Sequence, residues 1–278
     1  MREVLFADGT RVPVLGQGTW RMGERGSDRR AEADALRLGL DLGLSLVDTA
    51  EMYADGGAEE VVAEALAGRD RASVFLVSKA LPENASPARV ARALEGSLRR
   101  LRVDHLDLYL LHWRGGVPLA DTVAAFRRMR ERGLVRRWGV SNLDVADLRE
   151  LGAGALAECA TDQVLYNLEA RGVEHDLLPF CAARAMPVMA YSPVGQGGAL
   201  LRHPALRRVA DRHGCGPARV ALAWAIRAPG VVAIPKAADP AHVRDNAAAA
   251  ELTLSDGDLA EIDAAFPPPR RKVPLGML

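Results

Sequence analysis

LGLSLVDTAEMY, residues 42–53, is the stretch that decides the fold of this chain. An apolar run leads directly into an acid, Asp48, and a phenol, Tyr53, follows five residues later. Two later apolar runs end in the same manner, because FLVSK closes at Lys79 and LDLYLLH closes at His112. Near-continuous apolar runs are typical of parallel strands that are buried on both faces. We therefore predict three successive strands that each lead into ionisable side chains.

The spacing of such runs predicts a barrel. The first four intervals between run ends are 28, 31, 33 and 30 residues, and a strand with its returning helix needs about 30 residues. The pattern predicts an α/β fold, a (β/α)8 TIM barrel, with residues 1–278 as a single domain. The eight runs end near Trp20, Asp48, Lys79, His112, Asn142, Tyr166, Tyr191 and Pro235.

Helical patterns alternate with these strands and add two helices to the basic barrel. The extra helices are expected at 203–214 and 255–266, and an N-terminal β-hairpin at 4–16 is expected to turn at Asp8-Gly9 and close one barrel end. The eight barrel helices are expected at 29–42, 57–67, 86–101, 120–132, 144–157, 174–185, 216–228 and 239–249.

An open doubly wound sheet is the alternative fold. Its signature is G-x-G-x-x-G after the first strand, whereas LGQGTWRMG at 15–23 has no third glycine at the required step. The barrel is therefore favoured. The tail PPPRRKVPLGML at 267–278 cannot continue a helix and is expected on the surface or over a barrel mouth.

Composition excludes several functions. The formal net charge is +0 and the sequence pI is near 7.0, so nothing favours a nucleic-acid partner. The amino terminus has no apolar signal region and no run of about 18 apolar residues predicts a membrane span. Three cysteines without metal-ligand spacing are expected to be reduced, which predicts a cytoplasmic protein without a metal site.

The ionisable residues at the strand ends suit proton transfer to a carbonyl oxygen. In barrels of this type, the carboxyl ends of the strands form the site. Lys79 is expected to lower the pKa of Tyr53, with Asp48 as the counter-ion of the lysine. His112 would orient the carbonyl while Tyr53 protonates its oxygen as a hydride reaches the carbon.

Each of these residues also has a simpler interpretation. Taken alone, Tyr53 could be a loop aromatic and Lys79 a surface lysine. Asp48 could be a helix N-cap, and His112 could be a satisfied structural histidine. Their coincidence at the ends of neighbouring strands favours the catalytic interpretation.

The chain resembles the aldo-keto reductase superfamily from end to end, and within it the bacterial methylglyoxal-reductase-like members. The resemblance implies a catalytic set of Asp48, Tyr53, Lys79 and His112, and a nicotinamide cofactor bound without a Rossmann fold. The matching segments are LGQGTW at 15–20, DTAEMYADGGAEE at 48–60, LVSK at 76–79, DLYLLHW at 107–113, RRWGVSN at 136–142, DQVLYN at 162–167, MAYSPVGQGG at 189–198 and IPKAADPAHVRDN at 234–246.

The resemblance also implies a cofactor site, with NADP(H) rather than NAD(H). Tyr191 would stack on the nicotinamide ring, and Lys236, ahead of a helix amino terminus, would hold the 2′-phosphate. Ala237 and His242 depart from the hydroxyl and arginine that the family often has there. The implied cofactor contacts are Thr19, Trp20, Asp48, Ser141, Asn142, Gln163, Tyr191, Ser192, Val194, Gln196, Ile234, Lys236, Ala237, His242, Asp245 and Asn246.

An apolar substrate wall of Trp20, Met22, Met52 and Trp113 is predicted around the phenol. The short 114–119 loop and short tail predict an open mouth for small or varied carbonyls. The leading function is NAD(P)H-dependent reduction of aldehydes or ketones to alcohols by a monomer. A Schiff-base lyase or aldolase using Lys79, or a cofactor-sensing regulatory protein on the same scaffold, are the alternatives.

Overall fold

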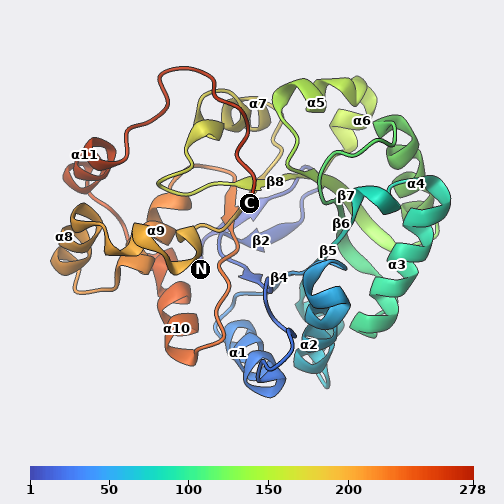
Figure 1. Cartoon of the computed structure of the whole chain (residues 1–278), viewed down its shortest axis with the longest axis horizontal. Helices are drawn as coiled ribbons and strands as arrows, with labels where there is room; N and C mark the ends of the chain where they lie inside the picture. Colours follow the sequence, from blue (N-terminus) through green and yellow to red (C-terminus); the bar gives the residue numbers. More distant parts are fainter.

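The protein is described from a computed structural model that covers residues 1–278. Eight parallel strands lie in the order β10-β9-β8-β7-β6-β5-β4-β3, with helices around them (Figure 1). The strands are β3 (Gln17–Gly18), β4 (Leu46–Asp48), β5 (Phe75–Ala80), β6 (Leu106–Leu111), β7 (Val135–Ser141), β8 (Asp162–Leu165), β9 (Val188–Tyr191) and β10 (Val231–Ala233).

The first and last strands meet and close the barrel. Leu15 pairs with Ala233 and Gly18 pairs with Lys236 through parallel bridges. At Gly18 an added Cβ would lie 2.7 Å from the carbonyl oxygen of Ile234, so the seam needs glycine there. The predicted (β/α)8 barrel is confirmed.

The helices follow the predicted alternation. The two extra helices are α8 (Pro204–Arg212) and α11 (Asp256–Ala265), close to their expected bounds. None of the helices is both long enough and apolar enough to cross a membrane. The helices after successive barrel strands are α1 (Arg29–Asp41), α2 (Gly57–Leu66), α3 (Pro87–Leu101), α4 (Leu119–Glu131), α5 (Val145–Glu150) with α6 (Gly152–Glu158), α7 (Leu177–Ala182), α9 (Pro217–Ala225) and α10 (Pro240–Ala248).

Two predicted helices are shorter than expected. The helix predicted at 144–157 is divided into α5 and α6 because Gly152 adopts a left-handed conformation with φ 75°. The helix predicted at 174–185 contains only the six residues of α7. Ala185 there has φ 49°, and Met186 precedes a proline, which disfavours helical backbone.

The hairpin and the tail occupy opposite ends of the barrel. Strands β1 (Glu3–Leu5) and β2 (Arg11–Pro13) pair antiparallel, and Phe6 in the turn stacks 5.4 Å from Phe75, the first residue of β5. The hairpin therefore covers the amino-terminal end of the barrel, as predicted.

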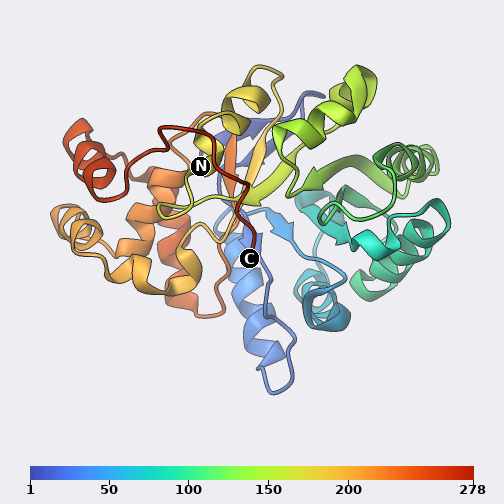
Figure 2. The same cartoon turned by 45° about the horizontal axis from the view of Figure 1, so that its top comes forward.

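The tail reaches the opposite mouth. After α11 it runs back over the barrel, and the carboxyl terminus lies near the centre (Figures 1 and 2). Lys272 Nζ lies 2.9 Å from both Asp144 and Asp176, and Met277 and Leu278 line the central cavity. The tail therefore lies over a barrel mouth, one of its two predicted positions, and the ion pairs of Lys272 hold it there.

Asp162 is a buried carboxyl group with little compensation. It is the first residue of β8, it is fully buried, and no side chain pairs with its oxygens, so the backbone of Leu143 is the one group that opposes the effect of burial on its pKa. Burial raises its pKa well above the ordinary value, and the nearby Asp147 and Asp144 act in the same direction. The folded protein therefore retains a proton that the unfolded chain releases above about pH 4.

We predict that Asp162→Asn stabilises the protein at pH 7 by about 1–3 kcal/mol, because the neutral amide folds without the proton uptake that the buried carboxyl group requires. Since the folded state binds more protons, wild-type stability should fall as the pH rises from about 4. The extra stability of the Asn variant should therefore vanish near pH 4. Urea unfolding of both proteins at pH 7 and at pH 4 measures the difference in the free energy of unfolding. The exposed Asp211, changed to Asn, is the control. A variant less stable than wild type at pH 7 would contradict this.

Candidate active site

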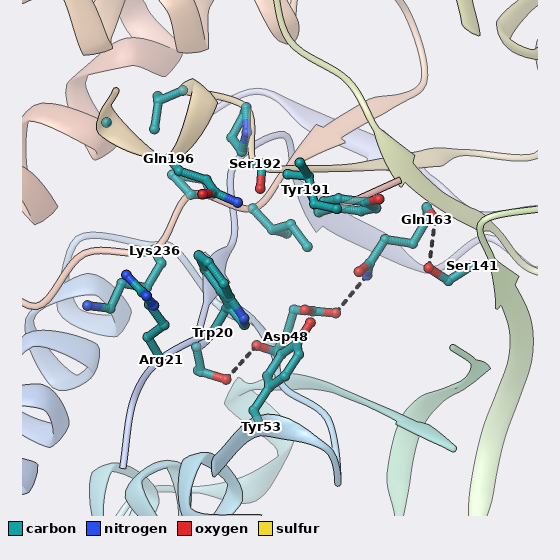
Figure 3. Close-up of a pocket in the computed structure, with 18 of the residues that line it drawn as sticks. Trp20, Arg21, Asp48, Tyr53, Ser141, Gln163, Tyr191, Ser192, Gln196 and Lys236 are labelled. Atoms are coloured by element: carbon teal, nitrogen blue, oxygen red, sulfur yellow. Dashed lines mark hydrogen bonds between the residues drawn. The ribbon is translucent and has the colours of Figure 1, made fainter. Parts of the chain in front are cut away.

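The four predicted catalytic residues meet at the carboxyl ends of β4, β5 and β6. Asp48 is the last residue of β4, Lys79 lies in β5, and His112 directly follows β6. Tyr53 opens a short 3-10 turn, Tyr53–Gly56, which leads into α2. In Figure 3 the ring of Tyr53 lies beside the carboxylate of Asp48.

Lys79 holds this group together. Its ammonium is fully buried and donates three hydrogen bonds: 2.6 Å to Asp48 Oδ2, 2.9 Å to the Thr49 carbonyl and 3.1 Å to Tyr53 Oη. These contacts use all three N–H donors of the amine. Because Tyr53 accepts from the lysine, its own O–H remains free to donate into the cavity.

The buried charges set the protonation states. Burial favours a neutral Lys79, but Asp48 and then Tyr53 outweigh it and raise the pKa of the ammonium above its ordinary value. For Tyr53, burial raises the pKa, and the opposing effect of Lys79 does not cancel it. Lys79 therefore lowers the pKa of Tyr53 as expected, but burial and the charge of Asp48 outweigh this effect, so the pKa lies above its ordinary value. The phenol is protonated at neutral pH and ready to act as a donor.

His112 is neutral. Burial, followed by the charge of Lys79, lowers the pKa of His112 to about 3. Its Nδ1 is buried and unpaired, which leaves Nε2 as the ring nitrogen that can serve the cavity. The ring lies edge-on to Tyr53 at 5.7 Å and 4.8 Å from Trp113. A neutral imidazole here can position a carbonyl oxygen.

A cavity of about 670 Å³ extends from the catalytic residues to the α10 side of the barrel. Every predicted cofactor contact except Ala237 lines it, and so do Trp20, Met52 and Trp113 of the predicted substrate wall. Figure 3 shows Gln196, Ser192, Lys236 and Trp20 around one part of this cavity and Tyr191, Gln163 and Asp48 around another.

Polar side chains are linked across the inner part of the cavity. Gln163 Nε2 donates to Asp48 Oδ1 at 2.7 Å, and Ser141 Oγ donates to the Gln163 carbonyl at 2.8 Å. Tyr191 Oη donates to Asn142 Oδ1 at 3.0 Å. Asn142 has φ 59°, which turns its amide towards the carbonyl of His112, 3.1 Å away. The network connects the predicted nicotinamide contacts to the carboxylate of Asp48.

Two predicted contacts do not reach the cavity. Met22 is fully buried in the core, because a turn in which its N–H bonds to the Thr19 carbonyl directs it inward. Ala237 lies against the core beside the cavity rather than on its wall. Asp245 does line the cavity, but its carboxylate pairs with Arg219, whose Nε donates at 2.8 Å.

Several lining residues were missed from the sequence, Arg21, Met277 and Leu278 among them. Arg21, with φ 67°, places its guanidinium 4.9 Å from the centre of the Trp20 ring. Its position next to Trp20 in LGQGTWRMG was a signal that could have found it. Met277 and Leu278 carried no such signal, because only the folding of the tail brings them to the mouth.

The α10 side of the cavity is suited to an anion. Lys236 is exposed and pairs with no carboxylate. Helix α10 begins at Pro240, and its cap Asp239 accepts the Ala241 N–H at 2.7 Å. The free ammonium therefore remains the main positive group on this side, together with Arg21, which lies near it in Figure 3.

Comparisons with known proteins agree with this geometry. Residues 14–266 match the model of the aldo/keto reductase family. The chain is 52% identical to methylglyoxal reductase YeaE of Escherichia coli (strain K12), over 100% of this chain and 99% of that protein. Glyoxal reductase of Bacillus subtilis (strain 168) is 32% identical, over 94% and 91% of the two chains. An aldo-keto reductase from Klebsiella pneumoniae, crystallised with NADPH, is 50% identical with a TM-score of 0.96 and covers both chains fully.

We predict that His112 does not titrate between pH 5 and 8, because burial and Lys79 keep its pKa at about 3. The ring-proton NMR shifts of His112 should stay constant over this range. A midpoint near pH 6.5 for His112 would contradict the proposed neutral state.

Proposed function

This chain belongs to the aldo/keto reductase family, and we propose that it uses NADPH to reduce small aldehydes, methylglyoxal among them, with Tyr53 as the proton donor. NAD(P)H-dependent reduction of aldehydes or ketones is the activity that the family match and the relatives establish.

The contact set of Lys79 carries the proposal. The ammonium is held by Asp48 and Thr49 and donates to Tyr53 Oη at 3.1 Å. This arrangement leaves the phenol O–H free and places a positive charge where the phenolate would form. Fixed charge of this kind stabilises a developing anion without rearrangement.

The protein side of the reaction follows from these contacts. Bound NADPH would supply the hydride to the carbonyl carbon. His112 donates a hydrogen bond to the carbonyl oxygen from its neutral ring and orients it. Tyr53 transfers its proton to that oxygen, and Lys79 stabilises the phenolate that remains. Asp48 remains the counter-ion of the Lys79 ammonium before and after the proton transfer.

The residues present fit a dinucleotide. Ser141, Asn142 and Gln163 offer amide and hydroxyl groups beside Asp48 for the carboxamide. Tyr191 offers an aromatic face for the ring, and the backbone of Gln196, at φ 56°, bends around the cavity between two glycines. Lys236 offers an unpaired cation for a phosphate group.

The apolar, open mouth of the cavity is suited to small, varied carbonyl substrates. Its apolar side chains are Trp20, Met52 and Trp113, joined by Met277 and Leu278 from the tail. Trp20 and Met52 remain 39% and 41% exposed, so the entrance is apolar without being closed. The names of the Escherichia coli and Bacillus subtilis relatives support methylglyoxal and glyoxal as the first compounds to test.

The two alternative functions are not favoured. A Schiff-base lyase needs an amine with a free lone pair, and Lys79 is a buried ammonium with all three donors engaged. A purely cofactor-sensing protein would not need the complete Asp48, Tyr53, Lys79 and His112 set. We also propose a cytoplasmic monomer, supported by three free cysteines and by a site built from one chain.

We predict that Tyr53→Phe lowers kcat for methylglyoxal reduction by about 10²- to 10⁴-fold, because the phenol is the proton donor. The dissociation constant of NADPH should stay near the wild-type value, since the aromatic ring is retained. Steady-state rates and fluorescence titration measure the two effects. Turnover close to wild type in the Phe variant would refute the assignment.

We predict a real but moderate preference for NADPH over NADH, because Lys236 adds charge-assisted contacts to the 2′-phosphate while Ala237 and His242 lack the hydroxyl and permanent cation. Lys236→Ala should reduce the preference, and Ala237→Ser with His242→Arg should increase it. Dissociation constants for both cofactors test this. Equal affinities in wild type, unchanged in Lys236→Ala, would exclude the phosphate site.

A further inference from the structure

The Tyr53–Gly56 turn has an uncommon backbone conformation. Ala54 and Asp55 have φ 51° and 52°, and Gly56 has φ 89°, so three consecutive residues are left-handed. Non-glycine residues rarely adopt this conformation, and it persists only where the surroundings enforce it. The residues around the turn must therefore hold it in place.

Arg100 of α3 lies directly against the turn. An added Cβ on Gly56 would lie 2.4 Å from Arg100 Cδ and Nε. Arg100 Nε donates to Glu59 Oε2 at 2.6 Å, and the other oxygen of Glu59 accepts from Ser78 Oγ at 2.6 Å. Glu59 is fully buried in the first turn of α2. The ion pair thus joins the turn to α3 and to β5.

The opposite side of the turn is also fixed. An added Cβ on Gly23 would lie 2.5 Å from the Gly57 carbonyl carbon, so two glycine backbones are in direct contact. The Gly23 N–H donates to Glu32 Oε2 at 2.8 Å, and Ser27 Oγ donates to the same oxygen at 3.2 Å. The turn that carries Tyr53 is consequently held between the Gly23 loop and Arg100.

We propose that Arg100, fixed by the buried Glu59, is a positioning residue for Tyr53: it supports the left-handed turn that sets the phenol at its distance from Lys79. The inference rests on the proposed role of Tyr53 as the proton donor. Neither Arg100 nor Glu59 lines the cavity, so both act through the backbone of the turn.

Loss of the Arg100–Glu59 pair should move Tyr53 and not Lys79, because other residues hold the lysine. Asp48 and Thr49 hold the ammonium independently of the turn. A loosened turn would therefore move the phenol away from a stationary lysine. A displacement of about 1 Å in a reacting group can cost about 10²-fold in rate, whereas the distant phosphate end of the cofactor site would be unaffected.

The test uses a double variant, Arg100→Met with Glu59→Gln, which leaves no unpaired charge buried. Single-turnover reduction of methylglyoxal by bound NADPH should slow by about 10- to 100-fold. The solvent deuterium isotope effect should increase, because proton transfer from Tyr53 becomes limiting. The NADPH dissociation constant should change less than about threefold. Arg100→Lys, which keeps the cation, should recover part of the rate.

A matched pair elsewhere controls for the loss of an ion pair. Arg127 of α4 binds Glu158 of α6 through two hydrogen bonds of 3.1 and 2.8 Å, away from the cavity. Arg127→Met with Glu158→Gln should leave the single-turnover rate and the isotope effect at their wild-type values. Ser78→Ala removes the other hydrogen bond to Glu59 without removing Arg100, and it should retain most of the rate.

Two results would overturn the inference. One is a wild-type rate in the folded Arg100→Met, Glu59→Gln protein. The other is a parallel loss of rate, NADPH affinity and thermal stability with an unchanged isotope effect, which would make the pair a general support. Tyr53→Phe separates this failure from that of the proposed function. An active Tyr53→Phe variant refutes Tyr53 as the donor. An inactive Tyr53→Phe variant, together with a wild-type rate in the Arg100→Met, Glu59→Gln variant, refutes the positioning role alone.

Discussion

The buried Lys79 ammonium is the constraint on which the rest of the site depends. A charge without exposure to water must be compensated, and removal of one partner from a buried ion pair typically costs about 3–5 kcal/mol. Three different segments provide the compensation: the end of β4 through Asp48, the backbone after it through Thr49, and the turn through Tyr53. The buried ammonium is therefore the point at which the end of β4, β5 and the turn of Tyr53 meet.

The barrel supplies the register that this assembly needs. Asp48 pairs with Val77, two residues before Lys79, and Lys79 pairs with Leu110, two residues before His112. Each ionisable group is thus displaced by two residues from the one before it, so all of them point to the same end of the barrel. The side chains between them, such as Ser78, face the helices, where Glu59 receives the hydroxyl. One strand consequently serves both the site and its support.

The sequence predicted the barrel and the catalytic set because both are local signals. Apolar runs mark the strands, and the residue that ends each run lies at the mouth whatever the details of packing. What the sequence could not decide concerns residues whose position or pKa depends on distant parts of the chain. Met22 follows Trp20 closely, yet a turn directs it into the core. The tail reaches the mouth because Lys272 finds two carboxylates on α5 and α7 caps, 128 and 96 residues away. The pKa of Tyr53 depends on how burial and Lys79 compare, and composition cannot show that balance.

The site has a rigid support beneath Tyr53 and an adjustable entrance above it. Beneath Tyr53, the buried carboxylates of Glu59 and Glu32 accept hydrogen bonds that tie the turn to β5, α3 and the Gly23 loop. Above it, the cavity is bordered by exposed apolar side chains, with Met277 and Leu278 on a tail held by the exposed Lys272. Proton transfer needs a fixed distance between Tyr53 and Lys79, whereas substrate entry needs only an apolar surface of adaptable shape. Because the two requirements fall on different residues, changes at the entrance can alter which carbonyls enter without disturbing the distance between Tyr53 and Lys79.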